Sequence, residues 1–285
     1  MEVLSTVDAT QKKCEELRLQ GKTLALVPTM GFFHEGHLEL MRVGKRLADV
    51  LLISIFVNPT QFGPHEDFDA YPRDTEGDLS KAREVGVDIV FFPNREEMYP
   101  EVFQTRVEVE KVTKHLCGLS RPGHFQGVTT VVAKLFNITK PHIAVFGQKD
   151  YQQLTVITRM VKDLNMDIEI LGVPTVREAD GLAMSSRNNY LTSEQRKSAL
   201  CLKKSLDLAK DMVRGGDRDA AVIKRAVEEL IRSYPYTEID YVHVCDPVSL
   251  EDIGKIEDEA LLALAVKVGK SRLIDNCILG DGSKK

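Results

Sequence analysis

The sequence predicts an α/β protein in which a doubly wound, Rossmann-like domain with a parallel sheet precedes a smaller C-terminal α+β domain. Short apolar runs rich in β-branched residues alternate with helical patterns through the first part of the chain. These runs are apolar at consecutive positions, which is typical of strands that are buried on both faces of a parallel sheet. The pattern changes after Pro174, so we expect one domain over residues 1–175 and another over 176–285.

The first domain is expected to alternate strands with helices. The predicted strands are Thr23–Val27, Val50–Val57, Asp88–Phe92, His142–Phe146 and Ile168–Val173, and the predicted helices are His37–Ala48, Thr75–Val85, Val128–Asn137 and Tyr151–Leu164. Ligands of such sheets bind beyond the carboxyl ends of the strands. The loops after Val27, Val57 and Phe146 are therefore the places to search for a site.

The second domain is expected to begin with a loop over residues 175–190. Thr192 and Gln195 then have the spacing of a capping box at the start of a helix. The remaining pattern predicts helices over residues 193–213 and 218–232, and strands over Ile239–Val244 and Leu261–Lys267.

Composition excludes several classes of protein. The net charge of −5 argues against broad binding to nucleic acids or anionic membranes, both of which require an excess of Lys and Arg. Met1–Lys13 lacks the apolar segment of a secretory signal, and Val50–Val57 is too short to span a bilayer. The cysteines form no C-x-x-C pair, which indicates a reducing compartment without a zinc cage or disulfide framework. We expect a cytoplasmic protein.

The segment from Pro28 to Leu38 leaves the first predicted strand and enters the first helix. Its glycines let the backbone approach a bulky ligand, and a helix N-terminus offers unpaired amides to an anion. His34 and His37 are three residues apart, so both can face one phosphate. A zinc-protease motif would need a histidine where Leu38 stands. The alternative is a helix cap with incidental histidines, but the position after a strand of a parallel sheet favours a phosphate site.

Two further loops follow predicted strands. Asn58 and Gln61 are uncharged groups that both donate and accept hydrogen bonds, which suits a hydroxylated acid; the alternative is a simple Asn-Pro turn. Lys149 would place a mobile cation near triphosphate oxygens, and Gly147 would expose backbone to a nucleotide base. The alternative is a surface lysine in a loop in which Asp150 caps the next helix.

The fourth segment runs from Asp180 to Asn188. Its adjacent hydroxyls, Ser185 and Ser186, stand beside Arg187 in a loop that begins with Asp-Gly, and such a set can clamp a phosphate. An interdomain linker with a helix cap is an equally good interpretation of this stretch alone.

Together these residues resemble a known family. The motifs PTMGFFHEGH, NPTQF, DAYPRD, RPGHFQGV, FGQKDYQQ and READGLAMSSRNNYL occur in the order and spacing of pantothenate synthetases, also called pantoate–β-alanine ligases. The resemblance runs from about Leu24 to Leu191. The histidine motif and the MSSRN loop are also similar to elements of the wider nucleotidyltransferase superfamily. Phe32-Phe33 stands where the family more often has smaller residues, which affects local packing rather than chemistry.

The resemblance implies a role for each matching residue. It implies ATP contacts for two sets of residues: the phosphate-binding and catalytic residues His34, His37, Lys149, Ser185, Ser186 and Arg187, and the nucleotide-pocket or ribose residues Met30, Gly147, Asp150, Val176 and Met184. Pantoate would be held by Gln61 and Gln153, with Asn58 beside them, and Arg121 would lie near the reacting centre. The resemblance also implies Mg²⁺ on the phosphates; the choice of Asp78 as an acidic residue near it is our own hypothesis and is not part of the resemblance.

The implied reaction has two steps. The carboxylate of pantoate attacks the α-phosphorus of ATP and pyrophosphate leaves; the amine of β-alanine then attacks the pantoyl adenylate, giving pantothenate and AMP. No residue pattern supplies a nucleophile with a paired base, so no covalent enzyme intermediate is expected. The resemblance further implies a homodimer. The alternatives are another nucleotidyltransferase that acts on a phosphate-bearing acceptor, and a nucleotide sensor without catalytic activity.

Overall fold

The computed structural model describes residues 1–64, 66 and 68–280, and the chain divides into two compact units. Unit 1 comprises Met1–Glu110, Arg121–Gln148 and Gln153–Pro174. Unit 2 comprises Lys111–Ser120, Lys149–Gln152 and the chain from Thr175 onward. The chain passes from unit 1 to unit 2 for the last time after Pro174. Lys111–Ser120 and Lys149–Gln152, which lie within residues 1–175, belong to unit 2.

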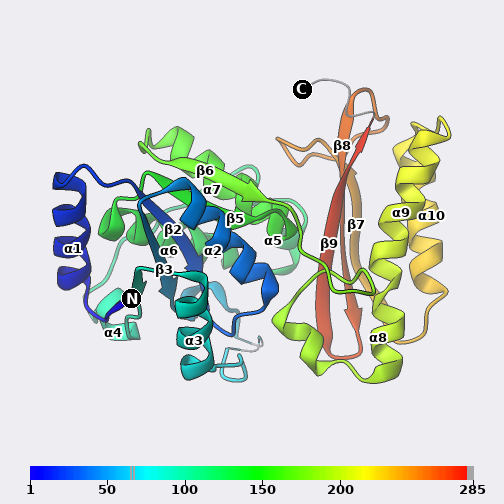
Figure 1. Ribbon diagram of the computed structural model, residues 1–285. Helices are drawn as coiled ribbons and strands as arrows, with labels where there is room; N and C mark the ends of the chain where they lie inside the picture. Colours follow the sequence, from blue (N-terminus) through cyan, green and yellow to red (C-terminus); the bar gives the residue numbers. More distant parts are fainter. Residues whose placement is uncertain (65, 67, 281–285) are drawn as a thin grey trace. The chain divides into compact units, whose positions relative to one another are not determined.

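Unit 1 is built on a six-stranded sheet in the order β1-β4-β3-β2-β5-β6, in which every neighbouring pair is parallel (Figure 1). This confirms the predicted doubly wound class. The strands are β1 (Glu2–Leu4), β2 (Leu24–Thr29), β3 (Val50–Ile55), β4 (Ile89–Phe91), β5 (Ile143–Gly147) and β6 (Glu169–Val173).

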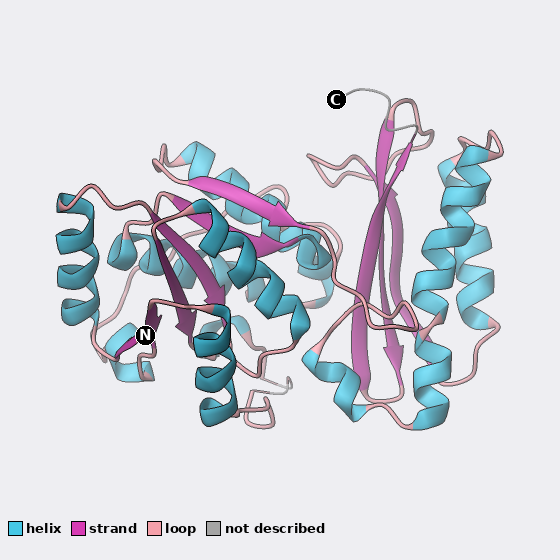
Figure 2. Cartoon of the chain, in the orientation of Figure 1, coloured by secondary structure: helices cyan, strands magenta, loops and turns pink. Residues whose placement is uncertain are grey.

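Helices cover both faces of this sheet, as Figure 2 shows. Successive side chains of a strand point to opposite faces, so Leu24 and Leu26 pack in one core while Ala25 and Val27 pack in the other. The first core is closed by α1 (Val7–Leu19), α6 (His124–Thr139) and α7 (Tyr151–Asp163), and the second by α2 (Glu35–Leu47) and α3 (Thr75–Val85). The remaining short helices of this unit are α4 (Arg95–Met98) and the 3₁₀ helix Pro59–Gln61.

Helix α3 has the boundaries that the sequence predicts. The Asp74 side chain accepts a hydrogen bond from the amide of Gly77, at 3.1 Å, and so caps the helix start. Gly86 ends the helix with φ of 87°, a left-handed conformation that glycine adopts without steric cost. These caps position the first turn of α3, which holds Asp78.

Unit 2 contains an antiparallel three-stranded sheet in the order β7-β8-β9, and helices pack against one face of it. Its regular elements are α5 (Cys117–Ser120), α8 (Ser193–Ala199), α9 (Cys201–Arg214), α10 (Ala220–Arg232), β7 (Thr237–Cys245), β8 (Glu259–Val268) and β9 (Ser271–Gly280), with two 3₁₀ helices, Gln148–Asp150 and Ser186–Tyr190. The capping box at Thr192 and Gln195 is present, with reciprocal distances of 3.1 and 3.3 Å.

Several elements differ from the sequence prediction. The helix predicted over residues 193–213 is divided at Leu200 into α8 and α9, and no proline or glycine marks the break. The elements β1, α1, α4, α5 and β9 were not predicted. Every second residue of β9 is buried, and one of these buried residues is the charged Asp275. Its charge hides the apolar pattern by which a strand is predicted.

No helix in the described part of the chain has the length and apolar character needed to cross a membrane.

Candidate active site

The loop after β2 presents its two histidines at the start of α2, as predicted. His34 is the N-cap residue of that helix, and His37 lies in its first turn. The two rings stack with their centroids 4.1 Å apart, and His37 Nδ1 lies 3.4 Å from the backbone nitrogen of His34. The imidazoles therefore stand together where a helix terminus favours an anion.

Asp78 on α3 binds the backbone of this loop. Its carboxylate oxygens accept hydrogen bonds from the backbone amides of Phe32 and Phe33, both at 2.6 Å. Lys81, one turn later, donates to the carbonyl of Phe33 at 2.8 Å. Gly31 and Phe32 have φ of 83° and 54°, so the anchored backbone is in the left-handed region. Burial raises the pKa of Asp78, although the two amides act in the opposite direction.

The loop after β3 brings together Met30, Asn58 and Gln61. The Asn58 side chain is 1% exposed, and its Nδ2 donates to Gln61 Oε1 and to the carbonyl of Gly127, both at 3.1 Å. Its Oδ1 accepts from the hydroxyl of Tyr99 at 2.9 Å. Gln61 Nε2 lies 3.1 Å from the sulfur of Met30. Three residues that the sequence analysis assigned to ligands thus form one cluster at the carboxyl ends of β2 and β3.

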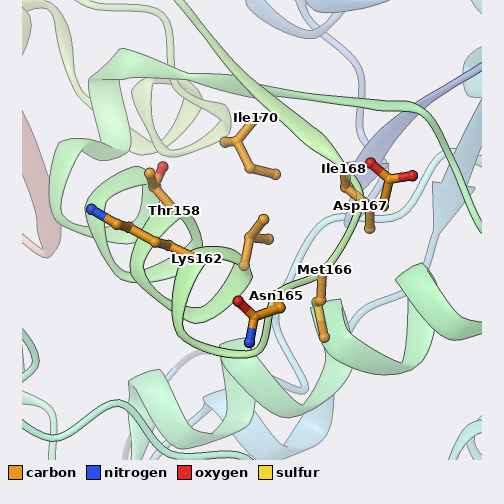
Figure 3. Close-up of a pocket in the computed structure, with 8 residues that line it drawn as sticks. Thr158, Lys162, Asn165, Met166, Asp167, Ile168 and Ile170 are labelled. Atoms are coloured by element: carbon orange, nitrogen blue, oxygen red, sulfur yellow. The ribbon is translucent and has the colours of Figure 1, made fainter.

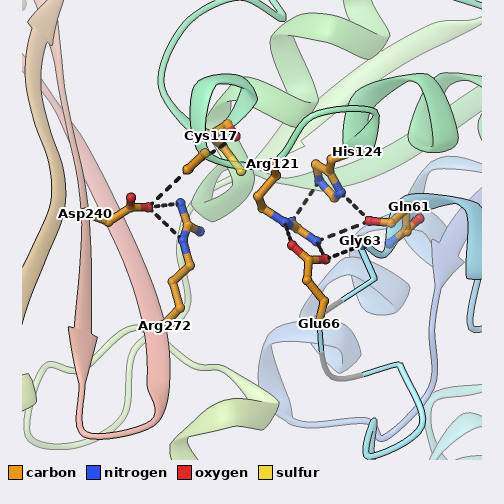
Figure 4. Close-up of polar contacts among 9 residues, drawn as sticks. Gln61, Gly63, Glu66, Cys117, Arg121, His124, Asp240 and Arg272 are labelled. Atoms are coloured by element: carbon orange, nitrogen blue, oxygen red, sulfur yellow. Dashed lines mark hydrogen bonds and ion pairs between the residues drawn. The ribbon is translucent and has the colours of Figure 1, made fainter.

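Arg121 lies beside the same cluster. It pairs with both carboxylate oxygens of Glu66 at 2.6 Å, and its Nη2 donates to the backbone carbonyl of Gln61 at 3.3 Å (Figure 4). His124 Nδ1 is 2.8 Å from the same carbonyl. Burial alone would raise the pKa of Glu66, but the contacts with Arg121 lower it overall. Arg121 is therefore a charged group held in place by a bidentate ion pair.

In unit 2, the loop that carries the serines and Arg187 is a folded structure. The amide of Met184 donates to the carbonyl of Val176 at 3.0 Å, which brings these two predicted nucleotide-pocket residues together. Ser185 accepts from the amide of Arg187 at 3.3 Å, and Ser186 is buried. These hydrogen bonds give the loop a defined conformation.

Strand β9 connects the two cation-bearing segments of unit 2. The Asn276 side chain donates to the backbone carbonyl of Lys149 at 2.9 Å. The Ser271 hydroxyl donates to the backbone carbonyl of Arg187 at 3.3 Å. Asp275 on the same strand is 2% exposed and forms a bidentate pair with Arg177, at 2.6 and 2.9 Å. Strand β9 was not predicted from the sequence, so these supports could not be anticipated.

The remaining predicted residues occupy their loops with fewer defined contacts. Gly147 ends β5, and Asp150 is exposed at the end of the following 3₁₀ helix. Gln153 is half-buried in the first turn of α7.

The described residues offer little for a metal ion. Among them, no group of three or more His, Cys, Asp or Glu side chains is arranged to hold one. Both oxygens of Asp78 already accept backbone amides. Mg²⁺ in nucleotide sites is commonly held by phosphates, waters and only one or two carboxylates. The described side chains therefore fit a Mg²⁺ ion whose ligands come mainly from the nucleotide and from water.

An open hollow of about 440 Å³ lies between α7 and β6 (Figure 3). Its lining residues are Thr158, Val161, Lys162, Asn165, Met166, Asp167, Ile168 and Ile170. The hollow includes the turn that precedes β6, at the amino end of that strand. Ligands of parallel sheets bind at the carboxyl ends, so the hollow is separate from the candidate site.

Comparison with known proteins gives a consistent result over the whole chain. The family described as "Pantoate-beta-alanine ligase" matches residues 2–278. The pantothenate synthetase of Syntrophus aciditrophicus is 56% identical, covering 99% of this chain and 98% of its own length. That of Desulfatibacillum aliphaticivorans is 58% identical, covering 98% and 99%.

Solved structures agree with these sequence matches. The pantothenate synthetase of Thermus thermophilus has a TM-score of 0.92 and 45% identity, covering 97% of this chain and 99% of its own. The pantoate-beta-alanine ligase of Francisella tularensis, solved in complex with beta-gamma ATP and beta-alanine, has a TM-score of 0.79 and 32% identity, covering 98% and 97%. The chain therefore belongs to the pantoate–β-alanine ligase family.

Proposed function

We propose that the protein condenses pantoate with β-alanine at the expense of ATP, releasing pantothenate, AMP and pyrophosphate. The observation that carries this proposal is the match to the ligase family over residues 2–278. It is supported by the Francisella tularensis relative, which was solved in complex with beta-gamma ATP and beta-alanine. We also propose a cytoplasmic location, in line with the five free cysteines.

The roles of individual residues follow the chemistry of each loop. In unit 1, we assign His34 and His37 to the phosphates of ATP, because they stand at a helix N-terminus. In unit 2, we assign Lys149, Arg187 and the adjacent serines to phosphate groups of a nucleotide. Met30, Gly147, Val176 and Met184 would contact the nucleotide, and Asp150 its ribose. Mg²⁺, when bound to the nucleotide, would neutralise phosphate charge; Asp78 is the acidic residue proposed near it.

The proposed first step joins a carboxylate oxygen of pantoate to the α-phosphorus of ATP, while the bond to pyrophosphate breaks. In the second step the β-alanine nitrogen bonds to the acyl carbon, AMP leaves, and the nitrogen loses a proton. The protein contributes position and neutralisation of charge, which are the main sources of catalysis in such transfers. Gln61 and Gln153 are assigned to pantoate, with Asn58 beside them, and Arg121 to the reacting centre.

Another nucleotidyltransferase activity is the nearest alternative. An acceptor that carries a phosphate requires cations in its pocket, whereas Gln61 and Gln153 are neutral. The neutral pair favours pantoate. A homodimer is proposed from the family resemblance.

Product identification tests the proposed function. The protein is incubated with ATP, magnesium, pantoate and β-alanine, and mass spectrometry should detect pantothenate and AMP in equal amounts. Omission of either pantoate or β-alanine should abolish pantothenate. Formation of ADP and orthophosphate in place of AMP and pyrophosphate would contradict adenylate formation, and nucleotide binding without turnover would indicate a sensor.

A further inference from the structure

We propose that Asn58 is a positioning residue that fixes the side-chain amide of Gln61, so that Gln61 meets pantoate as a hydrogen-bond donor. The proposal rests on the assignment of Gln61 to pantoate and deepens it in two ways. It states which end of the Gln61 amide faces the substrate, and it identifies Tyr99 and Gly127 as the residues that determine this orientation.

The first step is the orientation of Asn58 itself. One end of its amide faces the backbone carbonyl of Gly127, at 3.1 Å, and a carbonyl oxygen can only accept a hydrogen bond. The NH₂ group must therefore lie on that side. The other end faces the hydroxyls of Thr60 and Tyr99, each 2.9 Å from Oδ1, and both can donate. A reversed amide would place two acceptors against each other in a site where Asn58 is 1% exposed.

Tyr99 is suited to this role. Burial raises the pKa of its hydroxyl, so the group keeps its proton at neutral pH and remains a donor. The hydroxyl therefore acts with Thr60 to hold the oxygen of Asn58 and leaves the NH₂ group to face Gly127.

The second step passes this orientation to Gln61. The Nδ2 of Asn58 has a second hydrogen, and its partner at 3.1 Å is Gln61 Oε1. Since that atom must be an acceptor, the NH₂ group of Gln61 is directed the other way, where it lies 3.1 Å from the sulfur of Met30. Thioether sulfur is a weak acceptor. A pantoate oxygen would therefore be a better partner for this NH₂ group.

The backbone around Gln61 is fixed as well. A Cβ added to Gly127 would lie 2.3 Å from the carbonyl oxygen of Thr60 and 2.7 Å from the nitrogen of Gln61. Glycine at this position of α6 thus permits the close approach of the Pro59–Gln61 turn. The backbone carbonyl of Gln61 is also 2.8 Å from Nδ1 of His124 (Figure 4). With backbone and amide both held, Gln61 offers one defined donor.

A double-mutant cycle between Asn58→Asp and Gln61→Ala tests the proposal. An aspartate cannot donate to Gln61 Oε1, so the Gln61 amide should turn and lose its contact with pantoate. We expect Asn58→Asp to raise the KM for pantoate about tenfold, as for loss of a hydrogen bond, and to change the KM for ATP little. In the Gln61→Ala background the same change should raise the pantoate KM by less than about twofold, because the residue through which it acts is gone.

Tyr99→Phe provides a second variant in case the aspartate prevents folding. It removes one donor to Asn58 and introduces no charge, so it should raise the pantoate KM in the same direction but less strongly. It too should lose its effect in the Gln61→Ala background. Tyr234→Phe is the matched control, since it removes a tyrosine hydroxyl that accepts from Lys204 at 2.8 Å in unit 2. It should leave the pantoate KM unchanged.

The results distinguish the assignment of Gln61 to pantoate from the proposal that Asn58 orients Gln61. If Gln61→Ala leaves the pantoate KM unchanged, the assignment of Gln61 to pantoate fails, and the orientation proposal fails with it. If Gln61→Ala raises the KM while the Asn58 and Tyr99 variants keep their full effects in its absence, only the orientation proposal is overturned. Asn58 would then contact the substrate itself.

Discussion

His34 and Lys149, the residues proposed to stabilise phosphate charge in each unit, both lie on backbone that other side chains hold. The backbone that leads to His34 is anchored by Asp78, and the backbone of Lys149 is held by Asn276. In both cases the supporting residue binds main-chain atoms of the loop. Preorganised donors of this kind cost little reorganisation when charge develops in a transition state.

We therefore expect Lys149→Ala and His34→Ala each to lower turnover by about 10²-fold, the usual effect of removing one preorganised donor. The fold should survive, because neither side chain belongs to a hydrophobic core. Steady-state rates and thermal unfolding measure the two effects separately. Lys162→Ala on α7 is the control, as an exposed lysine near the amino end of β6. A folded Lys149 variant with near-normal turnover would exclude its assigned role.

The cysteines lead to a second prediction at this scale. Cys14, Cys201, Cys245 and Cys277 are buried, and burial raises the pKa of each thiol to about 12. The thiolate is the reactive form, so these side chains should resist alkylation in the folded protein. Cys117 is only half-buried.

Iodoacetamide should therefore modify Cys117 first, and peptide mass spectrometry can follow the order of modification. Most activity should remain, because no cysteine is assigned to a substrate. Inactivation that ATP and pantoate together prevent would instead indicate a thiol in the site.

Among the elements, the buried strands of the parallel sheet could be predicted well from sequence. Runs such as Val50–Ile55 are buried at every position and apolar at all of them except Ser54, because both faces of the sheet are covered by helices. Strand β9 could not be predicted in the same way. Its buried Asp275 is compatible with a core only because Arg177 pairs with it from 98 residues away, and such a partner is invisible in a local pattern.

Helix α3 gives a prediction at the scale of an element, since its first turn holds the histidine loop through Asp78. Asp78→Asn can still accept one of the two amides, but its NH₂ group would face the other. We expect a loss of about 1–3 kcal/mol in the free energy of unfolding, measured by urea denaturation, because a buried donor is left unpaired. Turnover should fall as well, since the loop that carries His34 is loosened.

Magnesium dependence distinguishes the two possible roles of Asp78. If the carboxylate acts on the loop, the magnesium concentration for half-maximal activity should be unchanged in Asp78→Asn. A large increase, with activity restored by excess magnesium, would support Asp78 as a metal ligand. Lys81→Met, which removes the neighbouring bond to the Phe33 carbonyl, should reduce stability without altering magnesium dependence.

At the scale of the whole molecule, the sequence indicates where the proposed site residues lie more readily than it indicates the residues that support them. His34, Gln61 and Lys149 stand next to predicted strand ends, and the rule that ligands bind there is general. Tyr99, Gly127 and Asn276 act through contacts that span 41, 69 and 127 residues of the chain. Nothing in the local sequence of Tyr99 or Asn276 indicates a part in the site. Gly127 belongs to the motif RPGHFQGV, but the motif does not show that Gly127 contacts Asn58, so only the folded chain could reveal these supports.

The order of the chemical steps provides the last prediction. If pantoate is activated first, labelled pyrophosphate should exchange into ATP when pantoate is present and β-alanine is absent. The phosphate-binding residues proposed in the two units would retain the adenylate, and pyrophosphate could then react with it in the reverse direction. Omission of pantoate should abolish the exchange, because no carboxylate would be present to attack ATP.

The same experiment tests the protein's contribution to this step. Lys149→Ala should slow the exchange by about as much as it slows turnover, roughly 10²-fold, if the lysine stabilises charge in adenylate formation. Gln61→Ala should slow exchange mainly at low pantoate and recover at high pantoate, because its loss weakens binding of that substrate. If the exchange requires β-alanine, adenylation of pantoate does not occur independently of the second substrate. Both pantoate and β-alanine would then have to be bound before ATP reacts.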